Sequence, residues 1–349
     1  MTSVRARRSR TTGPRLTDVA ALAGVSLGTV SHVLNHPHKV APGTRAKVEA
    51  AIDELGFSRN SMASALARGD TRTIGLVVVS LSNSMFVDIA RGAQRVARER
   101  DHYLQLASAD DDADLFDAHM RRMNETRSSG MLIAPMTDQT ASIARSRAAG
   151  CPVVVLNHDS SEHDACRVLV DNVAVGSIAA SHVLSLGRRH LAFVYGLPHL
   201  QPVRRRREGV RHTVAALDGV RLTEIEVDSL EAESGAAAGR ELAALPPEER
   251  PDAIIAVTDV LGMAVLNELT AQGLSVPGDV AVMGCDHNSV AWGSAVPLTS
   301  VTMEGQEMGA AAVRLLLTEL DESEESHEHS TVMLKPHLVP RESTTGRER

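Results

Sequence analysis

Aromatic residues are scarce in this sequence of 349 residues, which contains four Phe, two Tyr and one Trp. Its cores must therefore rest on aliphatic side chains, and the 43% hydrophobic fraction is large enough for two or three of them. Long apolar runs are also missing, because none reaches the roughly 18 residues that span a bilayer. The basic start is followed by no apolar stretch, so we expect a cytoplasmic protein without a signal peptide or a membrane partner.

Cysteine is rare as well, and Cys151, Cys166 and Cys285 share no CxxC spacing. This argues against a disulfide framework or a structural zinc site, and we expect buried, reduced thiols. The histidine pairs at 36–38 and 327–329 lack further ligands at metal spacing, so the sequence predicts no metal. Phosphate-binding glycine motifs and a G-x-S-x-G elbow are absent too. The sequence therefore suggests neither a nucleotide cofactor nor an enzyme.

A net positive charge is found only in the N-terminal part of the chain. Residues 1–70 contain ten Lys and Arg against five Asp and Glu, a net charge of +5, whereas the remaining residues carry a net charge of −13. An acidic body repels phosphate. This asymmetry therefore favours contact with nucleic acid through the N-terminal part alone.

The basic segment contains a pattern typical of two short helices joined by a tight turn. Thr17 is expected to cap a helix that runs through Ala23, and Ser26 a second helix that runs through Asn35, with Gly24 supplying the turn. Apolar residues recur at helical spacing on both sides of the turn, so the two helices can share one small core. The pattern predicts a helix-turn-helix.

A third helix is expected from about Thr44 to Leu55, before a terminating glycine. Together the three helices form an all-α head at residues 16–58. Residues 1–15 have no apolar periodicity and many Arg, and we expect a disordered basic arm there.

From residue 73 onward, short aliphatic runs alternate with amphipathic segments, which is typical of a parallel α/β sheet. The pattern then restarts, which predicts two lobes with a cleft at the carboxyl ends of their strands. The charged stretch 318–330 is expected to be a solvated loop before a last strand, VMLKPHLV. The first set of strands is expected at 74–80, 103–108, 130–135 and 152–157. The second set is expected at 167–171, 191–196, 224–228, 253–258 and 280–284, with helices near 173–186, 204–217, 234–244 and 260–272.

Residues 16–66 contain the segments LTDVAALAGVSLGTVSHVLN, TRAKVEAAIDELGF and RNSMASALA. These segments resemble the DNA-binding head of the LacI/GalR (lactose-repressor) family of bacterial transcription regulators. The resemblance continues through VDNVAVG, LGRRHLAFVYG, R-x-x-G, GLSVPGDVAVMGCD and LVPREST, so it covers nearly the whole chain.

The resemblance implies a hinge helix and linker at 59–72 and an effector-binding body at 73–349, two-lobed like the periplasmic sugar-binding proteins. Lobe 1 is expected at about 73–169 and 299–328, and lobe 2 at about 170–296 and 331–343.

In a helix-turn-helix, the start of the second helix faces base edges in the major groove. Leu27 and Gly28 can offer only methyl contact or close backbone approach, so base readout is expected from Thr29 and His32. The family usually has Arg at the position of His32, and the preferred operator is expected to differ accordingly. The alternative is that Leu27 and His32 merely pack or face solvent. The candidate DNA-contacting residues of the head are Thr17, Ser26, Leu27, Gly28, Thr29, His32 and Asn35.

The hinge adds three candidate DNA-binding residues, Asn60, Ala63 and Leu66. In the family the hinge folds in the minor groove and its Leu is inserted between base pairs, which is the role implied for Leu66. Ser64 stands where the family often has Arg, which removes one minor-groove contact. Alternatively, Leu66 is an ordinary linker residue.

The resemblance also implies a set of effector-binding residues. Arg206 is the Arg of the R-x-x-G motif and would clamp a hydroxyl or carboxylate, and short polar groups opposite it suit a sugar. Leu230 replaces an aromatic that stacks on the ligand in some relatives. Met85 and Thr258 could equally be wall packing. The candidate effector-binding residues are Met85, Phe86, Asn157, Arg206, Thr258, Asp259 and Asp286.

These patterns predict a ligand-responsive regulator, most simply a repressor that binds a palindromic DNA operator as a homodimer and a small sugar-like effector in the cleft. A solute-binding transport protein would share the body but needs a signal peptide and no helix-turn-helix. An enzyme would need a nucleophile or an acid–base pair. The identity of the effector and the sign of the response are left open.

Overall fold

The computed structural model describes residues 14–57, 71–160, 164–287, 296–322 and 327–346. The chain divides into two compact units, residues 1–69 and residues 70–349. Their described parts contain the predicted head and the predicted α/β body, whereas most of the predicted hinge and linker, 59–72, lies outside the described residues.

The first unit contains the three predicted helices, α1 (Leu16–Ala23), α2 (Leu27–Asn35) and α3 (Pro42–Leu55), with a short 3-10 turn, η1 (Pro37–Lys39), before α3. The turn between α1 and α2 depends on Gly24, whose φ of 66° lies in the left-handed region that glycine adopts without steric cost. The core of this unit contains Val19, Ala20, Val30, Val33, Val48 and Ala51. The prediction of a helix-turn-helix with one shared core is confirmed.

Thr17 does not cap the first helix, so that prediction is wrong. The helix is capped two residues earlier, by Arg15, whose backbone N–H donates to the carboxylate of Asp18 at 2.7 Å. An acidic side chain in the first turn can thus satisfy the helix start without a Thr cap. Ser26 caps α2 as predicted, because its hydroxyl accepts the backbone N–H of Thr29 at 3.1 Å.

Within the described ranges, no single helix is long and apolar enough to cross a membrane. The pair Leu16–Ala23 and Leu27–Leu34 would reach that length only in combination, and the two are bent by 104°.

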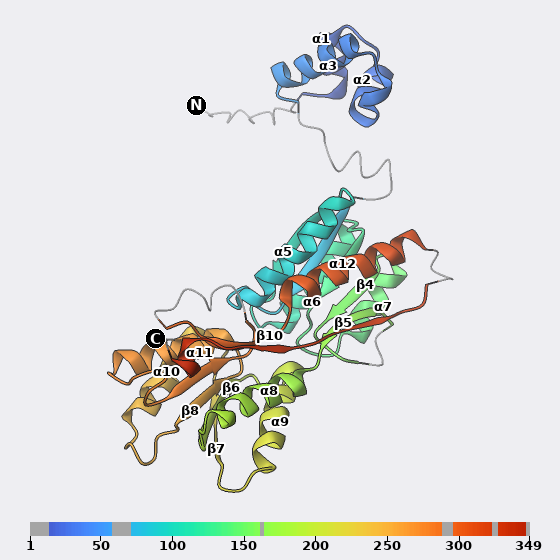
Figure 1. The fold of residues 1–349 in the computed structure, drawn as a ribbon. Helices are drawn as coiled ribbons and strands as arrows, with labels where there is room; N and C mark the ends of the chain where they lie inside the picture. The colour runs from blue at the N-terminus through green and yellow to red at the C-terminus, as the bar shows by residue number, and fades with distance from the viewer. Residues whose placement is uncertain (1–13, 58–70, 161–163, 288–295, 323–326, 347–349) are drawn as a thin grey trace, which may run out of the picture. The chain divides into compact units, whose positions relative to one another are not determined.

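The second unit is built on two six-stranded sheets (Figure 1). The first sheet has the strand order β11-β5-β4-β3-β1-β2, and all its neighbours are parallel. Its strands are β1 (Thr73–Val78), β2 (Tyr103–Ser108), β3 (Gly130–Ile133), β4 (Val153–Leu156), β5 (Cys166–Val170) and β11 (Thr331–Leu334).

The second sheet has the order β12-β10-β9-β8-β6-β7, in which β12 is antiparallel to β10 and the other pairs are parallel. Its strands are β6 (His190–Gly196), β7 (Arg221–Val227), β8 (Ala253–Ala256), β9 (Ala281–Gly284), β10 (Thr299–Thr302) and β12 (His337–Val339).

Helices flank both sheets. Those beside the first sheet are α5 (Ser84–Glu99), α6 (Ala113–Glu125), α7 (Thr140–Ala148) and α12 (Gly305–Asp321). Those beside the second are α8 (Asn172–Ser185), α9 (Gln201–Ala215), α10 (Ala232–Ala244), α11 (Asp259–Ala271) and the short α13 (Glu342–Thr345). The prediction of two successive α/β lobes is confirmed.

The structure corrects the assignment of segments to lobes. β5 was expected to open the second set of strands but pairs with β4 in the first sheet. β10 falls in a range expected for lobe 1 but joins the second sheet beside β9. The expected last strand is two strands, because Pro336 has no backbone N–H to continue a ladder; β11 joins the first sheet and β12 the second.

The stretch 318–330 is not wholly a solvated loop. α12 continues through Asp321, and the side chain of His327 is only 5% exposed. With these corrections, lobe 1 is the first sheet with its flanking helices and lobe 2 is the second sheet with its helices.

Candidate functional site

A cavity of about 690 Å³, counting the space at its mouth, lies where the carboxyl ends of the two sheets meet. Nearly all its lining follows the end of a strand, as expected for parallel α/β sheets. Lobe 1 contributes Val79, Ser80, Ser82, Asn83, Met85, Phe86, Asp111, Ala134, Pro135, Leu156 and Asn157. Lobe 2 contributes Leu200, Pro202, Val203, Arg206, Leu230, Glu231, Thr258 and Asp286.

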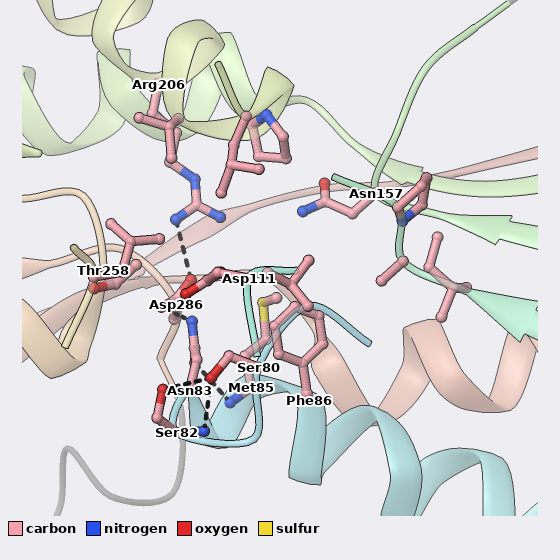
Figure 2. A pocket seen from close by; sticks show the side chains of 18 of the residues that line it. Ser80, Ser82, Asn83, Met85, Phe86, Asp111, Asn157, Arg206, Thr258 and Asp286 are labelled. Atoms are coloured by element: carbon pink, nitrogen blue, oxygen red, sulfur yellow. Dashed lines mark hydrogen bonds and ion pairs between the residues drawn. The ribbon is translucent and has the colours of Figure 1, made fainter. Parts of the chain in front are cut away.

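Arg206 extends from α9 toward Asp286, as Figure 2 shows, and is 3% exposed. Its Nη1 donates to the carbonyl oxygens of Val257 at 2.6 Å and Cys285 at 2.7 Å, and to Asp286 Oδ1 at 3.1 Å. Its Nε donates to Asn172 Oδ1 at 3.0 Å. A guanidinium held at two nitrogens has a fixed orientation, and its Nη2, which contacts the Met303 sulfur at 3.4 Å, retains donor capacity.

Two glycines allow Arg206 to reach the cavity. A Cβ on Gly209 would lie 2.0 Å from the carbonyl oxygen of Val173 on α8. A Cβ on Gly176 would lie 2.0 Å from the carbonyl oxygen of Arg206 itself. The glycine of the R-x-x-G motif thus lets α8 and α9 pack backbone to backbone, which sets the depth of the Arg206 side chain.

Asp286 is the second charged group of the cavity, and its side chain is 0% exposed. Its Oδ2 accepts the side-chain amide of Asn83 at 3.1 Å and the backbone N–H of Asp259 at 3.4 Å. Burial raises the pKa of the Asp286 carboxyl, and the Arg206 guanidinium opposes that rise. Because Asn83 belongs to lobe 1, this carboxylate joins the two lobes.

Asn157 lies at the end of β4, and its φ of 50° turns the chain sharply there. Its Oδ1 accepts from Asn172 Nδ2 at 2.8 Å, and Asn172 in turn accepts from Arg206. A chain of polar contacts therefore runs from Asn157 to Asp286. Two sequence-predicted residues, Asn157 and Arg206, are linked by Asn172, which the sequence reasoning did not select.

Met85 and Phe86 occupy the first turn of α5, and Figure 2 shows both side chains on the lobe 1 side of the cavity. The side chain of Asn83 caps this helix by accepting the backbone N–H of Met85 at 2.9 Å. With Ala134, Pro135 and Leu156, these side chains form an apolar wall.

Of the predicted effector residues, Met85, Phe86, Asn157, Arg206, Thr258 and Asp286 line the cavity. Asp259 is not part of the lining, and its carboxylate accepts from the Ser300 hydroxyl at 2.6 Å. It starts α11 behind Asp286, so it supports the cavity floor from below.

Several lining residues escaped the sequence reasoning. Ser82 donates across the lobes to Glu231 at 2.5 Å, which adds to the interlobe bonds of Asn83 and Asn157. Burial raises the pKa of the Asp111 carboxyl, and the negative charges of Glu231 and Asp110 raise it further. The rule that sites follow strand ends could have selected Asp111, which comes three residues after β2.

In the head, the start of α2 presents exposed side chains. Leu27 is 49% exposed, and the hydroxyls of Ser26 and Thr29 lie 2.9 Å apart. His32 is exposed, with its ring 5.8 Å from that of His36. Thr17 is exposed on α1, whereas the side chain of Asn35 and the hinge residues Asn60, Ala63 and Leu66 lie outside the described residues.

The geometry agrees with comparisons to known proteins. A model of the bacterial regulatory proteins of the lacI family matches residues 15–60, and a periplasmic binding protein-like domain matches residues 180–344. The transcriptional regulator CelR of Thermobifida fusca is 32% identical over 348 residues, covering 95% of this chain and 98% of CelR. The chain belongs to the LacI family of bacterial regulatory proteins.

Other relatives of this LacI-family chain are repressors. The ribose operon repressor of Escherichia coli K12 is 29% identical and the repressor PurR of Aliivibrio fischeri 26% identical, covering 93% and 95% of this chain and 98% of each relative. A CelR–cellobiose complex is 31% identical, with a TM-score of 0.68 over 95% of this chain and 99% of CelR. The lac repressor dimer bound to its operator shares the fold, with a TM-score of 0.78 at 23% identity over 95% and 99% of the two chains.

These findings confirm the family resemblance and the two-lobed fold that it implied. They also agree with the prediction of a regulator, since the relatives are transcriptional repressors and not enzymes.

Proposed function

We propose that this LacI-family protein is a cytoplasmic repressor that binds a palindromic operator as a homodimer and changes its grip on DNA when a small sugar or sugar derivative binds between the lobes. The observation that carries the ligand part is the buried, paired Arg206 and Asp286 at the base of the cavity, to which Asn157 is linked through Asn172. Vicinal hydroxyls both donate and accept, so they can bind to both members of such a pair.

The charges of the cavity favour a neutral, hydroxyl-rich ligand. Asp111, Glu231 and Asp286 line it together with one arginine. An anionic ligand would meet this excess of carboxylates, and its affinity would suffer. The apolar wall of Met85 and Phe86 suits the less polar face of a sugar ring. Relatives described as a ribose operon repressor and as a regulator in complex with cellobiose agree with this class.

Ligand binding can act on the lobes through bonds that cross between them at the cavity, Ser82 to Glu231, Asn83 to Asp286 and Asn172 to Asn157. A ligand hydroxyl placed beside Asp286 competes with Asn83 or adds to it. Either outcome changes the free-energy difference between open and closed lobes, which is what coupling requires.

On the DNA side, we propose that α2 enters the major groove with Leu27, Gly28, Thr29 and His32 toward the bases, and that Thr17, Ser26 and Asn35 contact nearby groups. The exposure of Leu27 and His32 supports this assignment. Asn60, Ala63 and Leu66 are proposed to bind in the minor groove, with Leu66 as the inserted side chain.

A thermal-stability screen of sugars with the full chain tests the ligand part. A true effector at 100 times its Kd should stabilise the protein by about 2.7 kcal/mol. The same sugar must then change operator affinity in a gel-shift or anisotropy titration. A panel of pentoses, hexoses and disaccharides that leaves both quantities unchanged would refute the sugar assignment.

Operator selection from random DNA tests the reading helix. His32→Arg should shift preference toward guanine at one symmetric pair of positions, by about 1–3 kcal/mol, because Arg pairs bidentately with that base. His212→Ala, an exposed histidine on α9 in the body, is the matched control and should leave the selected sequence unchanged. Identical preferences for His32→Arg and the wild type would remove His32 from the base-reading set.

A further inference from the structure

Four side chains from distant parts of the sequence converge at one edge of lobe 1. Cys166 is the first residue of β5, Glu319 lies in the last turn of α12, and His327 and His329 precede β11. One ligand atom from each lies within 4.8 Å of all the others. Because β5 runs toward the cavity, this cluster sits at the opposite, amino end of the first sheet and is not part of the effector site.

The spacing of the four atoms fits a tetrahedral metal site. Cys166 Sγ lies 3.2 Å from His327 Nε2 and 3.7 Å from His329 Nδ1, and His327 Nε2 lies 3.6 Å from Glu319 Oε2. Around a zinc ion with ordinary bond lengths, the edges of such a tetrahedron would be about 3.3–3.6 Å. The four groups could therefore close on an ion with small shifts.

The other nitrogen of each imidazole is held by a carboxylate. His327 Nδ1 lies 2.7 Å from Glu322 Oε2, and His329 Nε2 lies 3.1 Å from Asp164 Oδ1. A carboxylate on one ring nitrogen fixes the tautomer that leaves the other nitrogen as a lone-pair donor. In both histidines the nitrogen left over is the one that faces the cluster.

Glu319 supplies an independent sign of a missing partner. Its Oε1 accepts from Arg147 at 2.5 Å, whereas its Oε2 is buried and accepts no hydrogen bond from any residue that the structure describes. A buried carboxylate oxygen without a donor is costly, and it lies against the sulfur and the two imidazoles. The backbone N–H of Ser330 lies 3.5 Å from the Cys166 sulfur and would stabilise a thiolate there.

We propose that Cys166, Glu319, His327 and His329 bind one divalent transition-metal ion, with zinc the best fit. One sulfur and two imidazole nitrogens favour zinc over magnesium, calcium or manganese, which prefer oxygen ligands. Four protein ligands fill a tetrahedral shell, so the ion has a structural role. It would tie α12 and the start of β11 to the start of β5.

The test is metal binding by the full chain after treatment with a chelator. One Zn²⁺ per chain should bind in a chromophoric competition titration, and Co²⁺ should give the visible and thiolate charge-transfer bands of a tetrahedral sulfur-containing site. His329→Gln and Cys166→Ser should lose this stoichiometric site. Cys151→Ser is the matched control, since Cys151 is also buried in lobe 1 but is not part of the cluster, and it should bind normally.

Two further variants test the positioning role of the carboxylates. Asp164→Asn and Glu322→Gln should each weaken Zn²⁺ binding by about 10–100-fold, because they keep the ligands and remove only the partner of a ligand. Zn²⁺ should raise the melting temperature of the wild type, and chelator should reverse the rise, with neither effect in His329→Gln. The proposal is overturned if the wild type binds no Zn²⁺ at micromolar concentration, or if His329→Gln binds it as tightly as the wild type.

Discussion

The two lobes contribute unequally to the cavity between them. Lobe 2 supplies a guanidinium and a carboxylate that are already paired and hydrogen-bonded to backbone groups, whereas lobe 1 supplies mainly an apolar wall with short hydroxyl and amide groups at its edge. A group fixed before binding loses little conformational freedom when a ligand arrives. We therefore expect lobe 2 to be the anchor of the site and lobe 1 to adjust over a bound ligand.

The anchor is rigid for a second reason. Arg206 and Asp286 are almost fully buried, and a buried charge is tolerated only while it is paired. Loss of one partner should therefore disturb both stability and ligand binding. Loss of an apolar contact on lobe 1 should lower ligand affinity by less.

The largest effect is expected from Arg206→Met. It leaves the carboxylate of Asp286 buried without its cation and should cost about 3–5 kcal/mol of unfolding free energy in a urea titration. The double variant with Asp286→Asn should recover most of that loss. Neither protein should respond to effector. A double variant no more stable than the single one would mean that the pair is not the source of the cost.

A smaller effect, about 1–3 kcal/mol, is expected from Gly209→Ala, because the new methyl group would meet the backbone of α8. Gly309→Ala in lobe 1 is the matched variant, since its Cβ would lie 1.9 Å from the carbonyl oxygen of Ile89. Both should lower the melting temperature. Effector affinity, measured by calorimetry, should fall more for Gly209→Ala, because only that change displaces Arg206; equal losses would contradict the unequal roles of the lobes.

Glu224 on β7 offers a test of lobe 2 away from the cavity. Burial alone would raise the pKa of its carboxyl, but hydrogen bonds from Arg207 and Arg211 lower it to about 2 from its ordinary 4.5. The ion pairs thus stabilise the fold above about pH 4.5 and lose that contribution as the pH falls toward 2.

Glu224→Gln should therefore cost about 1–2 kcal/mol at neutral pH, discounted because Arg211 is half exposed, and this difference from the wild type should shrink on acidification. Unfolding titrations at several pH values measure it. Effector binding should be unchanged. A loss of binding would show that effector affinity depends on the stability of lobe 2 as a whole and not on Arg206 and Asp286 alone.

The smallest effect is expected on lobe 1. Phe86→Leu keeps an apolar wall and should change effector affinity by less than about 1.5 kcal/mol, without a change in operator affinity in the absence of ligand. Calorimetry and anisotropy measure the two quantities. A complete loss of effector binding would mean that lobe 1, and not lobe 2, supplies most of the binding free energy.

Much of this site follows from the sequence. Strand ends in parallel sheets converge, so Asn157, Arg206 and Asp286 could be placed together from the order of strands and the family's motifs. Asn172 and Asn83 could not, because their roles depend on which side chains they meet across helices and lobes. The lobe assignment of β10 failed because sheet membership after a crossover is a tertiary property that local pattern does not encode.

The cluster of Cys166, Glu319, His327 and His329 also depends on tertiary contacts that the local sequence pattern does not encode. Near His327 and His329, the sequence offers too few further ligands at metal spacing to predict a site. The remaining ligand atoms come from Cys166, more than 150 residues earlier, and from the end of α12, which the charge pattern had suggested was loop.

We expect ligand binding at Arg206 and Asp286 to change DNA binding by the head. The most direct measurement is operator affinity of the full chain, with and without a sugar that stabilises it, for the wild type and for the Arg206→Met/Asp286→Asn double variant. We expect at least about a tenfold change for the wild type, equivalent to about 1.4 kcal/mol, and equal affinities with and without sugar for the double variant. A double variant that responds to the sugar as the wild type does would contradict this coupling.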